Sequence, residues 1–461
     1  MISPQIFKAY DIRAIYPTEM NEDSIAVITK AIYTFFVKVA GDDNLEIVVG
    51  GDMRLSTPSL LKVVKDTLVG MGASVIDVGL VSTPTFYYAV RNLKADAGIQ
   101  ISASHNPKEY NGMKIVRNTP DGLIKIGTTT GMDEIKKMAI DNNFPEVGTP
   151  GSIRSDNSIL DQEVENSIIL AEPDVISPLK VVADAANAMG ATYLEALFKK
   201  LPCTLVKMNF ELDGTFPAHQ PDPLQFETLV DLQKKVISEK ADLGIAPDGD
   251  GDRVFFINEK GDVIPASLIT ALVARELLKK YPGEKIAFDV RSTMTPLKIV
   301  KEYGGIPVLT KVGHALITET MHKENVLFAG ESSGHYYFRE TGFAESLMPV
   351  ILIVLSVISR EKKPISEIVE PLKRSIESGE VNFKLADKEL ADSAFEKIKS
   401  EFVEGKISEL DGIAVDYPDW RFSVRSSNTE PLLRLNIEAS NSELLNAKKE
   451  KLVGMLEGLG K

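Results

Sequence analysis

The chain has 461 residues, of which 44% are hydrophobic and 26% are charged, and its formal net charge at pH 7 is −14. This length predicts several domains, and the negative charge argues against nucleic acid and anionic membranes as partners, because both favour basic surfaces. No apolar run reaches the length of a membrane span, and Met1–Gln5 does not read as the start of a secretory signal. The single cysteine, Cys203, fits a reducing compartment. We therefore expect a cytoplasmic protein.

A pattern of strand, acidic turn, helix, glycine or proline, and second strand recurs three times along the chain. Buried parallel strands connected by helices produce this pattern, so it predicts three related mixed α/β domains. The expected strands are 45–50 and 74–78, 180–184 and 203–206, and 285–288 and 306–309, with helices through 60–68, 193–197 and 297–301.

The end of the chain has a different pattern. Segments 412–416, 421–424 and 432–437 alternate as antiparallel strands do, and 441–456 predicts a closing helix with Ser440 as N-cap and Glu443 completing a capping box. The apolar run Met348–Ile358 predicts a buried helix. We therefore expect an α/β protein whose fourth domain is α+β, with domains at 1–149, 150–257, 258–373 and 374–461.

The first segment that could carry chemistry contains Ser104. An apolar strand candidate, Ala97–Ile101, is followed by small polar residues and then by Asn106-Pro107, which favours a turn. A serine at such a strand end can expose its hydroxyl in a cleft, and His105 and Lys114 are near enough to handle protons or pair with a phosphate. An ordinary polar turn is the alternative, and the extended run through Lys114 favours a site.

Three aspartates alternate with glycines in Asp248-Gly249-Asp250-Gly251-Asp252-Arg253. Carboxylates this close repel one another unless a cation lies among them, and oxygen ligands favour Mg²⁺ or Ca²⁺ over zinc. An EF-hand loop is one alternative, because Glu259 stands at its twelfth position, but Arg253 replaces the required glycine and both flanks look like strands. A solvated acidic turn is the other alternative. We predict a metal site.

The segment Gly330–His335 carries candidate sugar-binding groups. Glu331 and Ser333 offer an acceptor and a hydroxyl, and His335 could carry a proton near neutral pH. His314 is a second histidine that could serve the same cleft. For both, an ordinary structural role is the alternative.

Two further segments could bind an anion. Arg425–Pro431 combines an arginine with hydroxyls and consecutive backbone amides, which together suit a phosphate; a polar hairpin tip is the alternative. Near the start, Tyr10 and Arg13 could cover a substrate phosphate, or could belong to a strand with a solvated face.

Taken together and in this order, these segments resemble the α-D-phosphohexomutase family, particularly its phosphomannomutase/phosphoglucomutase branch. The resemblance covers essentially the whole chain, and the serine segment, the acidic segment and Arg425–Pro431 are each quite specific to it. It implies four domains around a central cleft, each contributing one loop.

The resemblance also implies a role for each candidate residue, with Ser104 carrying the phosphoryl group and one Mg²⁺ held against it. The implied catalytic residues are Ser104, His105, Lys114, Arg253 and His335, and the implied metal ligands are Ser104, Asp248, Asp250 and Asp252. The implied substrate-binding residues are Tyr10, Arg13, Arg291, His314, Glu331, Ser333, Arg425, Ser427, Asn428 and Thr429.

The implied reaction interconverts a hexose 1-phosphate and a hexose 6-phosphate, with a hexose 1,6-bisphosphate as intermediate and activator. Tyr110-Asn111-Gly112 favours mannose and glucose as the sugars, whereas Ser332 stands where relatives differ and favours none of them; Arg291 replaces a common lysine. The alternatives are a phosphoglucosamine mutase, a metal-dependent sugar phosphatase and a non-catalytic sugar-phosphate binder. The expected partner is a phosphosugar, with no nucleic acid and no membrane, and the protein would be a monomer or a homo-oligomer.

Overall fold

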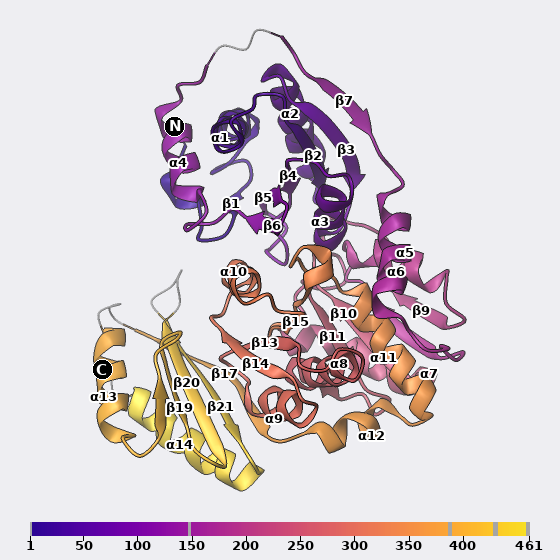
Figure 1. Ribbon diagram of the computed structural model, residues 1–461, viewed down its shortest axis with the longest axis vertical. Helices are drawn as coiled ribbons and strands as arrows, with labels where there is room; N and C mark the ends of the chain where they lie inside the picture. Colours follow the sequence, from indigo (N-terminus) through magenta and orange to yellow (C-terminus); the bar gives the residue numbers. More distant parts are fainter. Residues whose placement is uncertain (1, 146–148, 386–389, 427–431, 458–461) are drawn as a thin grey trace. The chain divides into compact units, whose positions relative to one another are not determined.

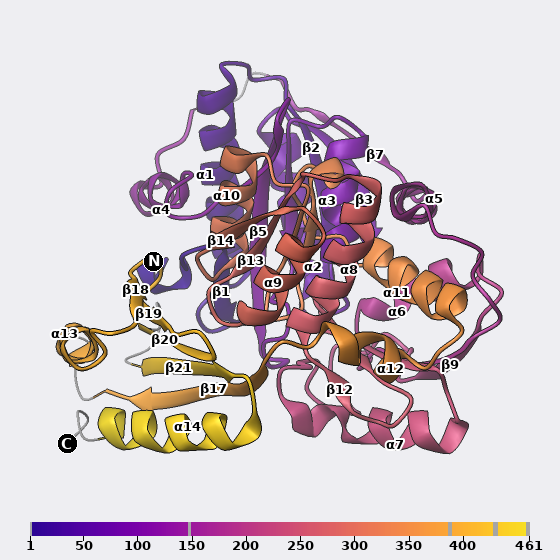
Figure 2. The ribbon, with the colours of Figure 1, turned by 60° about the horizontal axis from the view of Figure 1, so that its bottom comes forward.

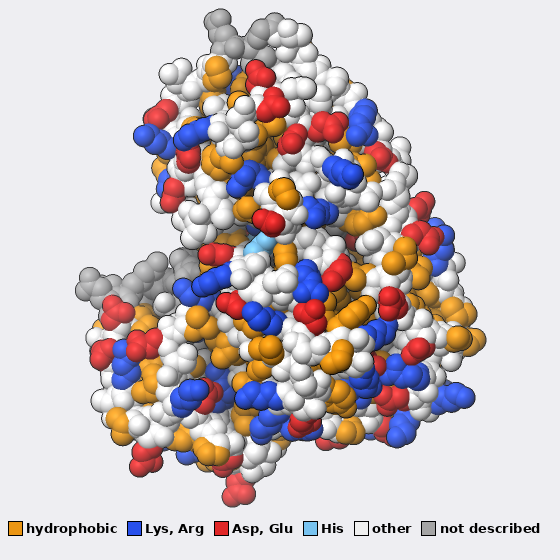
Figure 3. Space-filling view, viewed as in Figure 1, with side chains coloured by type: hydrophobic (Ala, Val, Ile, Leu, Met, Phe, Trp, Pro, Cys, Tyr) orange, Lys and Arg blue, Asp and Glu red, His pale blue; other side chains and the backbone are white. Residues whose placement is uncertain are grey.

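The computed structural model describes residues 2–145, 149–385, 390–426 and 432–457. Figure 1 and Figure 2 show the helices and strands, which form two compact units. The first unit comprises Met1–Ile264 and Ser333–Ser366, and the second comprises Pro265–Ser332 and Glu367–Lys461. Among the described helices, none is long and apolar enough to cross a bilayer. Figure 3 shows acidic and basic side chains interspersed over one face. The four domain boundaries expected from the sequence stay a prediction.

The first unit begins with a mixed sheet whose strand order is β1-β5-β4-β2-β3-β7, with β6 paired to β5. Strands β4, β2, β3 and β7 run parallel, and β1, β5 and β6 join antiparallel. The strands are β1 (Ile12–Ile15), β2 (Glu46–Gly51), β3 (Ser74–Leu80), β4 (Ala97–Ile101), β5 (Tyr110–Thr119), β6 (Gly122–Lys125) and β7 (Ser152–Ser155). The helices are α1 (Glu22–Ala40), α2 (Thr57–Gly70), α3 (Thr83–Asn92) and α4 (Met132–Asp141).

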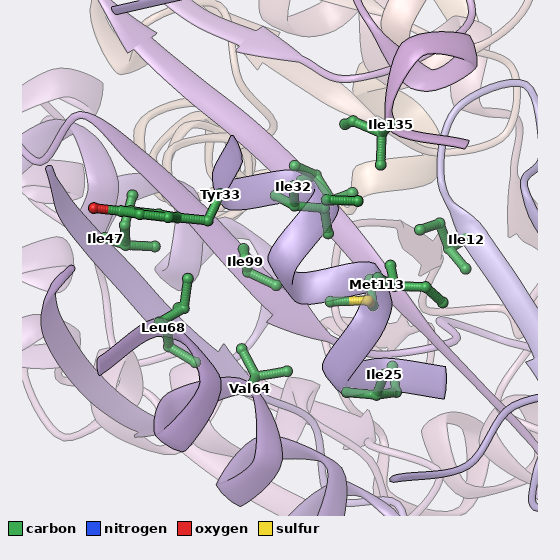
Figure 4. Packing of buried hydrophobic residues seen from close by; sticks show 14 of the residues in the cluster. Ile12, Ile25, Ile32, Tyr33, Ile47, Val64, Leu68, Ile99, Met113 and Ile135 are labelled. Atoms are coloured by element: carbon green, nitrogen blue, oxygen red, sulfur yellow. The ribbon is translucent and has the colours of Figure 1, made fainter. Parts of the chain in front are cut away.

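Alternate side chains of β2 enter two different cores, because successive side chains of a strand point to opposite faces. Ile47 and Val49 pack in one cluster with apolar residues of α1 and α2, which Figure 4 shows from close by. Val48 belongs to a second cluster with Phe86 and Val90 of α3. The sheet is thus covered on both faces.

A second sheet in the same unit has the order β12-β11-β10-β8-β9. Its strands are β8 (Lys180–Asp184), β9 (Thr204–Met208), β10 (Leu243–Pro247), β11 (Val254–Ile257) and β12 (Val263–Ile264). The helices are α5 (Ile159–Ala171), α6 (Gly190–Phe198), α7 (Val230–Glu239) and α11 (Met348–Glu361). The antiparallel strands β10 and β11 flank the acidic segment, so the EF-hand alternative is wrong, because that loop requires helices on both sides. The buried helix predicted at Met348–Ile358 is confirmed as α11.

The second unit contains a parallel sheet and an antiparallel sheet. The parallel sheet pairs β14 (Ile306–Thr310), β13 (Lys285–Asp289) and β15 (Phe328–Gly330). Its helices are α8 (Ala266–Lys280), α9 (Met294–Glu302) and α10 (His314–Glu324). The recurring strand–helix–strand pattern is therefore confirmed in all three places. β16 (Tyr336–Phe338) belongs to the first unit, and α12 (Ile365–Val369) contains the boundary between the units.

The antiparallel sheet expected at the end of the chain is also confirmed, with the order β17-β21-β20-β19-β18. Its strands are β17 (Ile376–Lys384), β18 (Lys406–Ser408), β19 (Ile413–Asp416), β20 (Trp420–Ser426) and β21 (Leu432–Ala439), and α13 (Leu390–Glu401) and α14 (Ser442–Glu457) pack on it (Figure 2). The predicted N-cap is wrong. The side chain of Asn441, not Ser440, accepts the backbone N–H of Leu444 at 2.9 Å, because α14 begins one residue later than expected.

Candidate active site

Ser104 lies just beyond the end of β4, in a strained backbone conformation. Its φ is +50°, in the left-handed region that residues other than glycine seldom adopt, and it is 2% exposed. Its N–H donates to the hydroxyl of Ser102 at 3.1 Å. Its Oγ lies 3.1 Å from Asp248 Oδ2 and 3.1 Å from His105 Nδ1. The structure therefore brings the candidate nucleophile to the acidic segment, as the resemblance implies.

Asp248, Asp250 and Asp252 each place a carboxylate oxygen within 4.8 Å of the others, and all three side chains are buried. Burial and the neighbouring carboxylates of Asp252 and Asp250 raise the pKa of Asp248 well above its usual value. Asp250 Oδ1 is buried and accepts no hydrogen bond. Converging hard oxygen ligands with excess negative charge fit a divalent cation such as Mg²⁺.

Lys114 on β5 is buried beside the same carboxylates. Its Nζ lies 2.5 Å from Asp250 Oδ2 and 2.6 Å from Asp252 Oδ2. Burial acts to lower the pKa of Lys114, but the two carboxylates outweigh it and raise that pKa well above its usual value. The charged form of Lys114 is therefore favoured in this arrangement.

His335 approaches the acidic segment from another part of the same unit, and Arg253 is the last residue of that segment. His335 Nε2 lies 3.2 Å from Asp252 Oδ1, and its Nδ1 lies 2.9 Å from the hydroxyl of Ser333. Arg253 Nε lies 3.7 Å from Asp248 Oδ2. Both ring nitrogens of His335 thus face fixed partners, which restricts the orientation of the ring.

His105 and Arg13 both lie near Ser104, but His105 favours its neutral form and Arg13 is a paired cation. Burial and the positive charges of Arg253 and Arg13 lower the pKa of His105 well below its usual value, which favours the neutral ring. Arg13 lies on β1 and donates to Asp11 at 2.7 Å. It also donates to the side chain of Asn106 in the serine loop, the segment 102–110 that follows β4. Arg13 is therefore anchored at the serine loop and is not part of a solvated face. Tyr10 is half-buried just before β1.

In the second unit, Arg291 and Glu331 form a separate cluster. Arg291 pairs with Asp289 at 2.9 Å and with Glu331 Oε1 at 3.0 Å, and Glu331 Oε1 also accepts the N–H of Gly313 at 3.2 Å. His314 follows as the first residue of α10. The cluster presents an arginine fork and a carboxylate that are suited to sugar hydroxyls and phosphate.

Arg425, at the end of β20, is 7% exposed and lies 3.5 Å from Asp411 and 3.6 Å from Glu380. Burial and the positive charge of Arg291 lower its pKa, so the two arginines share one region of the unit. Ser427, Asn428 and Thr429 lie outside the described residues.

Three buried or half-buried residues support the first-unit cluster and were missed from the sequence. Thr83, at the start of α3, donates to Asp250 Oδ2 at 2.6 Å. Arg54 donates to backbone carbonyls of the serine loop, and Gln220 donates to the carbonyl of His105. Of the three, only Arg54 could have been suspected from the sequence, because it is a cation in the polar turn that follows a buried strand. The partners of all three lie far away in the chain.

Comparison with known proteins accounts for the whole chain. Models of the phosphoglucomutase/phosphomannomutase family match in four consecutive parts: α/β/α domains I, II and III at residues 4–138, 162–261 and 265–375, and the C-terminal domain at residues 380–454.

Individual relatives agree with this match. A phosphomannomutase of Vibrio cholerae serotype O1 is 37% identical, with 98% of each chain covered. A protein of Xanthomonas campestris pv. campestris named phosphohexose mutases is 36% identical over 98% of this chain and 99% of its own. The crystal structure of a phosphoglucomutase/phosphomannomutase family protein from Burkholderia thailandensis superposes with a TM-score of 0.89 at 32% identity, covering 100% of this chain and 98% of that one. This chain therefore belongs to the phosphoglucomutase/phosphomannomutase family.

Proposed function

We propose that this protein is a phosphohexomutase that interconverts the 1-phosphate and the 6-phosphate of mannose, glucose or both. The observation that carries the proposal is the placement of Ser104 Oγ 3.1 Å from Asp248 Oδ2, at the edge of three converging carboxylates. The name phosphomannomutase of the Vibrio cholerae relative supports the same type of reaction with mannose as the sugar.

In the proposed reaction the phosphoryl group resides on Ser104 and passes to the free hydroxyl of a hexose monophosphate. The P–Oγ bond of Ser104 breaks while a bond to the sugar oxygen forms, which gives a hexose 1,6-bisphosphate. The bisphosphate turns end for end, and Ser104 takes back the other phosphoryl group, leaving the isomeric monophosphate. Phosphoryl transfer depends mainly on alignment and on neutralising charge, and a buried, densely charged site supplies both.

The first-unit residues would divide this work. Asp248, Asp250 and Asp252 would hold one Mg²⁺ together with the Ser104 phosphate. The ion would neutralise charge on the transferred group. Lys114 and His335 are the proposed proton-handling groups: Lys114, whose charged form is favoured, would donate a proton to the leaving oxygen, and His335 would take the proton from the attacking sugar hydroxyl.

The remaining charged residues have proposed binding roles. Arg253 and His105 would flank the phosphoserine, and Tyr10 and Arg13 would cover a phosphate of the substrate. The residues proposed to bind the sugar and its non-reacting phosphate are Arg291, His314, Glu331, Ser333, Arg425, Ser427, Asn428 and Thr429. One phosphate site must accept either end of the bisphosphate, and a trace of bisphosphate would prime Ser104.

The test is conversion of glucose 1-phosphate to glucose 6-phosphate with Mg²⁺ and a trace of glucose 1,6-bisphosphate. Ser104→Ala should abolish turnover and the added mass of one phosphate, because no other group accepts the phosphoryl. Ser155→Ala, an exposed serine on β7, is the matched control and should retain both. Turnover that survives in Ser104→Ala would contradict the proposal.

The same assay separates the alternatives. A metal-dependent phosphatase would release inorganic phosphate, whereas a mutase releases only traces of it. A phosphoglucosamine mutase would show a higher kcat/KM on glucosamine phosphate than on glucose or mannose phosphate. We expect the highest values on mannose and glucose phosphates.

A further inference from the structure

Arg54 is a fully buried arginine in the turn between β2 and α2, with 0% exposure. Its Nε lies 3.3 Å from Asp52 Oδ2, and its guanidinium carbon lies 5.2 Å from the centre of the Phe216 ring. Asp52 is itself fixed, because it accepts the hydroxyl of Thr57 at 2.8 Å. The guanidinium therefore has one orientation and cannot reach solvent.

The four remaining donor directions of this side chain all end on the backbone of the serine loop. Nη2 donates to the carbonyls of Ser104 at 2.8 Å and Asn106 at 2.6 Å. Nη1 donates to the carbonyls of Pro107 at 2.7 Å and Tyr110 at 2.9 Å. Four carbonyls converging on one planar cation match the rigid fork of arginine, and the single ammonium of lysine cannot reach all of them.

The carbonyl of His105, which Arg54 does not contact, accepts a hydrogen bond from another side chain of the same unit. Gln220, in the loop after β9, donates its side-chain amide to the carbonyl of His105. The carbonyl of the adjacent Pro221 accepts the N–H of Gly249 at 3.0 Å. Gly249 belongs to the acidic loop, which is the segment Asp248–Arg253. The carbonyls of residues 104–107 are thus all bonded to side-chain donors, and the loop has little freedom to relax.

This restraint acts where the backbone is strained. Ser104 has a φ of +50°, a conformation that persists only when the surroundings impose it. The hydrogen bond from Arg54 to the Ser104 carbonyl imposes it directly, and the bonds at Asn106 and Pro107 hold the turn that follows. The conformation in turn sets the direction of Oγ toward Asp248.

We propose that Arg54 is a positioning residue for phosphoryl transfer: it holds the serine loop in the strained conformation that presents Ser104 Oγ to the acidic loop. The inference rests on the proposed mutase function. Among the described residues, the polar partners of Arg54 are Asp52 and backbone carbonyls, not Ser104 Oγ. We therefore expect its substitution to change the alignment of Oγ and not the binding of substrate.

The test compares Arg54→Lys with Arg91→Lys. Arg91 also donates to backbone carbonyls, those of Thr119 at 2.7 Å and Pro120 at 3.4 Å, but at the turn between β5 and β6. For Arg54→Lys we expect kcat to fall about a hundredfold and KM to change by less than about threefold. Arg91→Lys should retain the wild-type kcat even where its thermal stability falls to a similar extent.

Hydrogen–deuterium exchange gives a readout that needs no activity. Amides in the segment 103–110 should exchange faster in Arg54→Lys than in the wild type, whereas Arg91→Lys should leave them unchanged. If the wild type interconverts no hexose phosphate, the proposed function fails while this measurement still decides whether Arg54 restrains the loop.

Three outcomes would overturn the inference: an unchanged kcat in Arg54→Lys, a loss confined to KM, or unchanged exchange in 103–110. If Arg54→Lys does not fold, Gln220→Leu serves instead, since Gln220 is half-buried and supplies one donor. We then expect a fall in kcat of about tenfold with KM retained, and an unchanged kcat again contradicts the inference.

Discussion

At the scale of single residues, Gly249 shows how closely the two reacting loops approach. A Cβ added at this position would lie 2.3 Å from the carbonyl oxygen of Ser104, which Arg54 also holds, and 3.2 Å from the Pro221 ring. No side chain fits there without moving one of the loops. The glycine is thus required by the contact between serine and acidic loops, in addition to any role in the turn.

Gly249→Ala should therefore lower kcat by about a hundredfold, because it pushes the serine loop away from the carboxylates. Gly454→Ala is the matched control, since an added Cβ in the middle of α14 meets nothing within 4 Å. The control should retain kcat and raise the free energy of unfolding by about 0.5–1 kcal/mol. Steady-state kinetics and urea unfolding measure both effects, and an active Gly249→Ala would show that the loops can separate without loss.

At the scale of elements, helix α5 carries a carboxyl on its buried face. Glu163 is 2% exposed, and its Oε2 has no hydrogen-bond partner. Burial raises the pKa of Glu163 to about 7, although a hydrogen bond with Thr85 lowers it. Ile159, Glu163 and Ser167 follow one another at helical spacing, which places the acid on the buried face of the helix.

Glu163→Gln should stabilise the protein increasingly as the pH rises. The folded protein holds the Glu163 proton more tightly than the unfolded chain does, so stability is lost as the pH rises from about 4.5 through about 7. The free energy of unfolding of the variant, relative to wild type, should increase by about 2 kcal/mol between pH 5 and pH 8.

Glu165→Gln, at an exposed position of the same helix, is the control for this measurement. Its free energy of unfolding relative to wild type, measured over the same range, gives the effect of removing an exposed carboxylate from this helix. A constant difference between Glu163→Gln and wild type would mean that Glu163 is ionised in the folded protein across this range.

At the scale of the whole molecule, a buried ion pair joins the two sheets of the second unit. Glu438 on β21 accepts the N–H groups of Thr293 and Met294 at the start of α9, at 2.7 and 2.9 Å. Arg421 on β20 lies 3.2 Å from Glu438 and donates to the carbonyl of Val290 at 2.8 Å. The antiparallel sheet is therefore attached to the parallel one through charges that are removed from water.

Arg421→Met should cost about 3–5 kcal/mol of unfolding free energy, because it leaves Glu438 buried without its cation. Lys399→Met removes ion pairs with the exposed carboxylates of Glu396 and Glu409 and should cost less than about 1 kcal/mol. Calorimetry of the full chain measures the loss of stability in each variant. Equal losses would mean that the buried pair of Arg421 and Glu438 contributes no more to stability than an exposed pair.

The sequence by itself predicted the three strand–helix–strand repeats and the terminal antiparallel strands, because apolar periodicity is a local property. It also singled out Ser104 and the three aspartates as candidates, because their chemistry lies within short segments. The N-cap of α14 was misplaced by one residue because neighbouring polar residues compete for that position. Only the tertiary structure decided the surroundings of these groups. Arg54 and Gln220 meet their carbonyls 50 and 115 residues away in the chain. Such contacts, like the burial of Glu163, depend on which distant segments pack together, and local sequence does not contain that information.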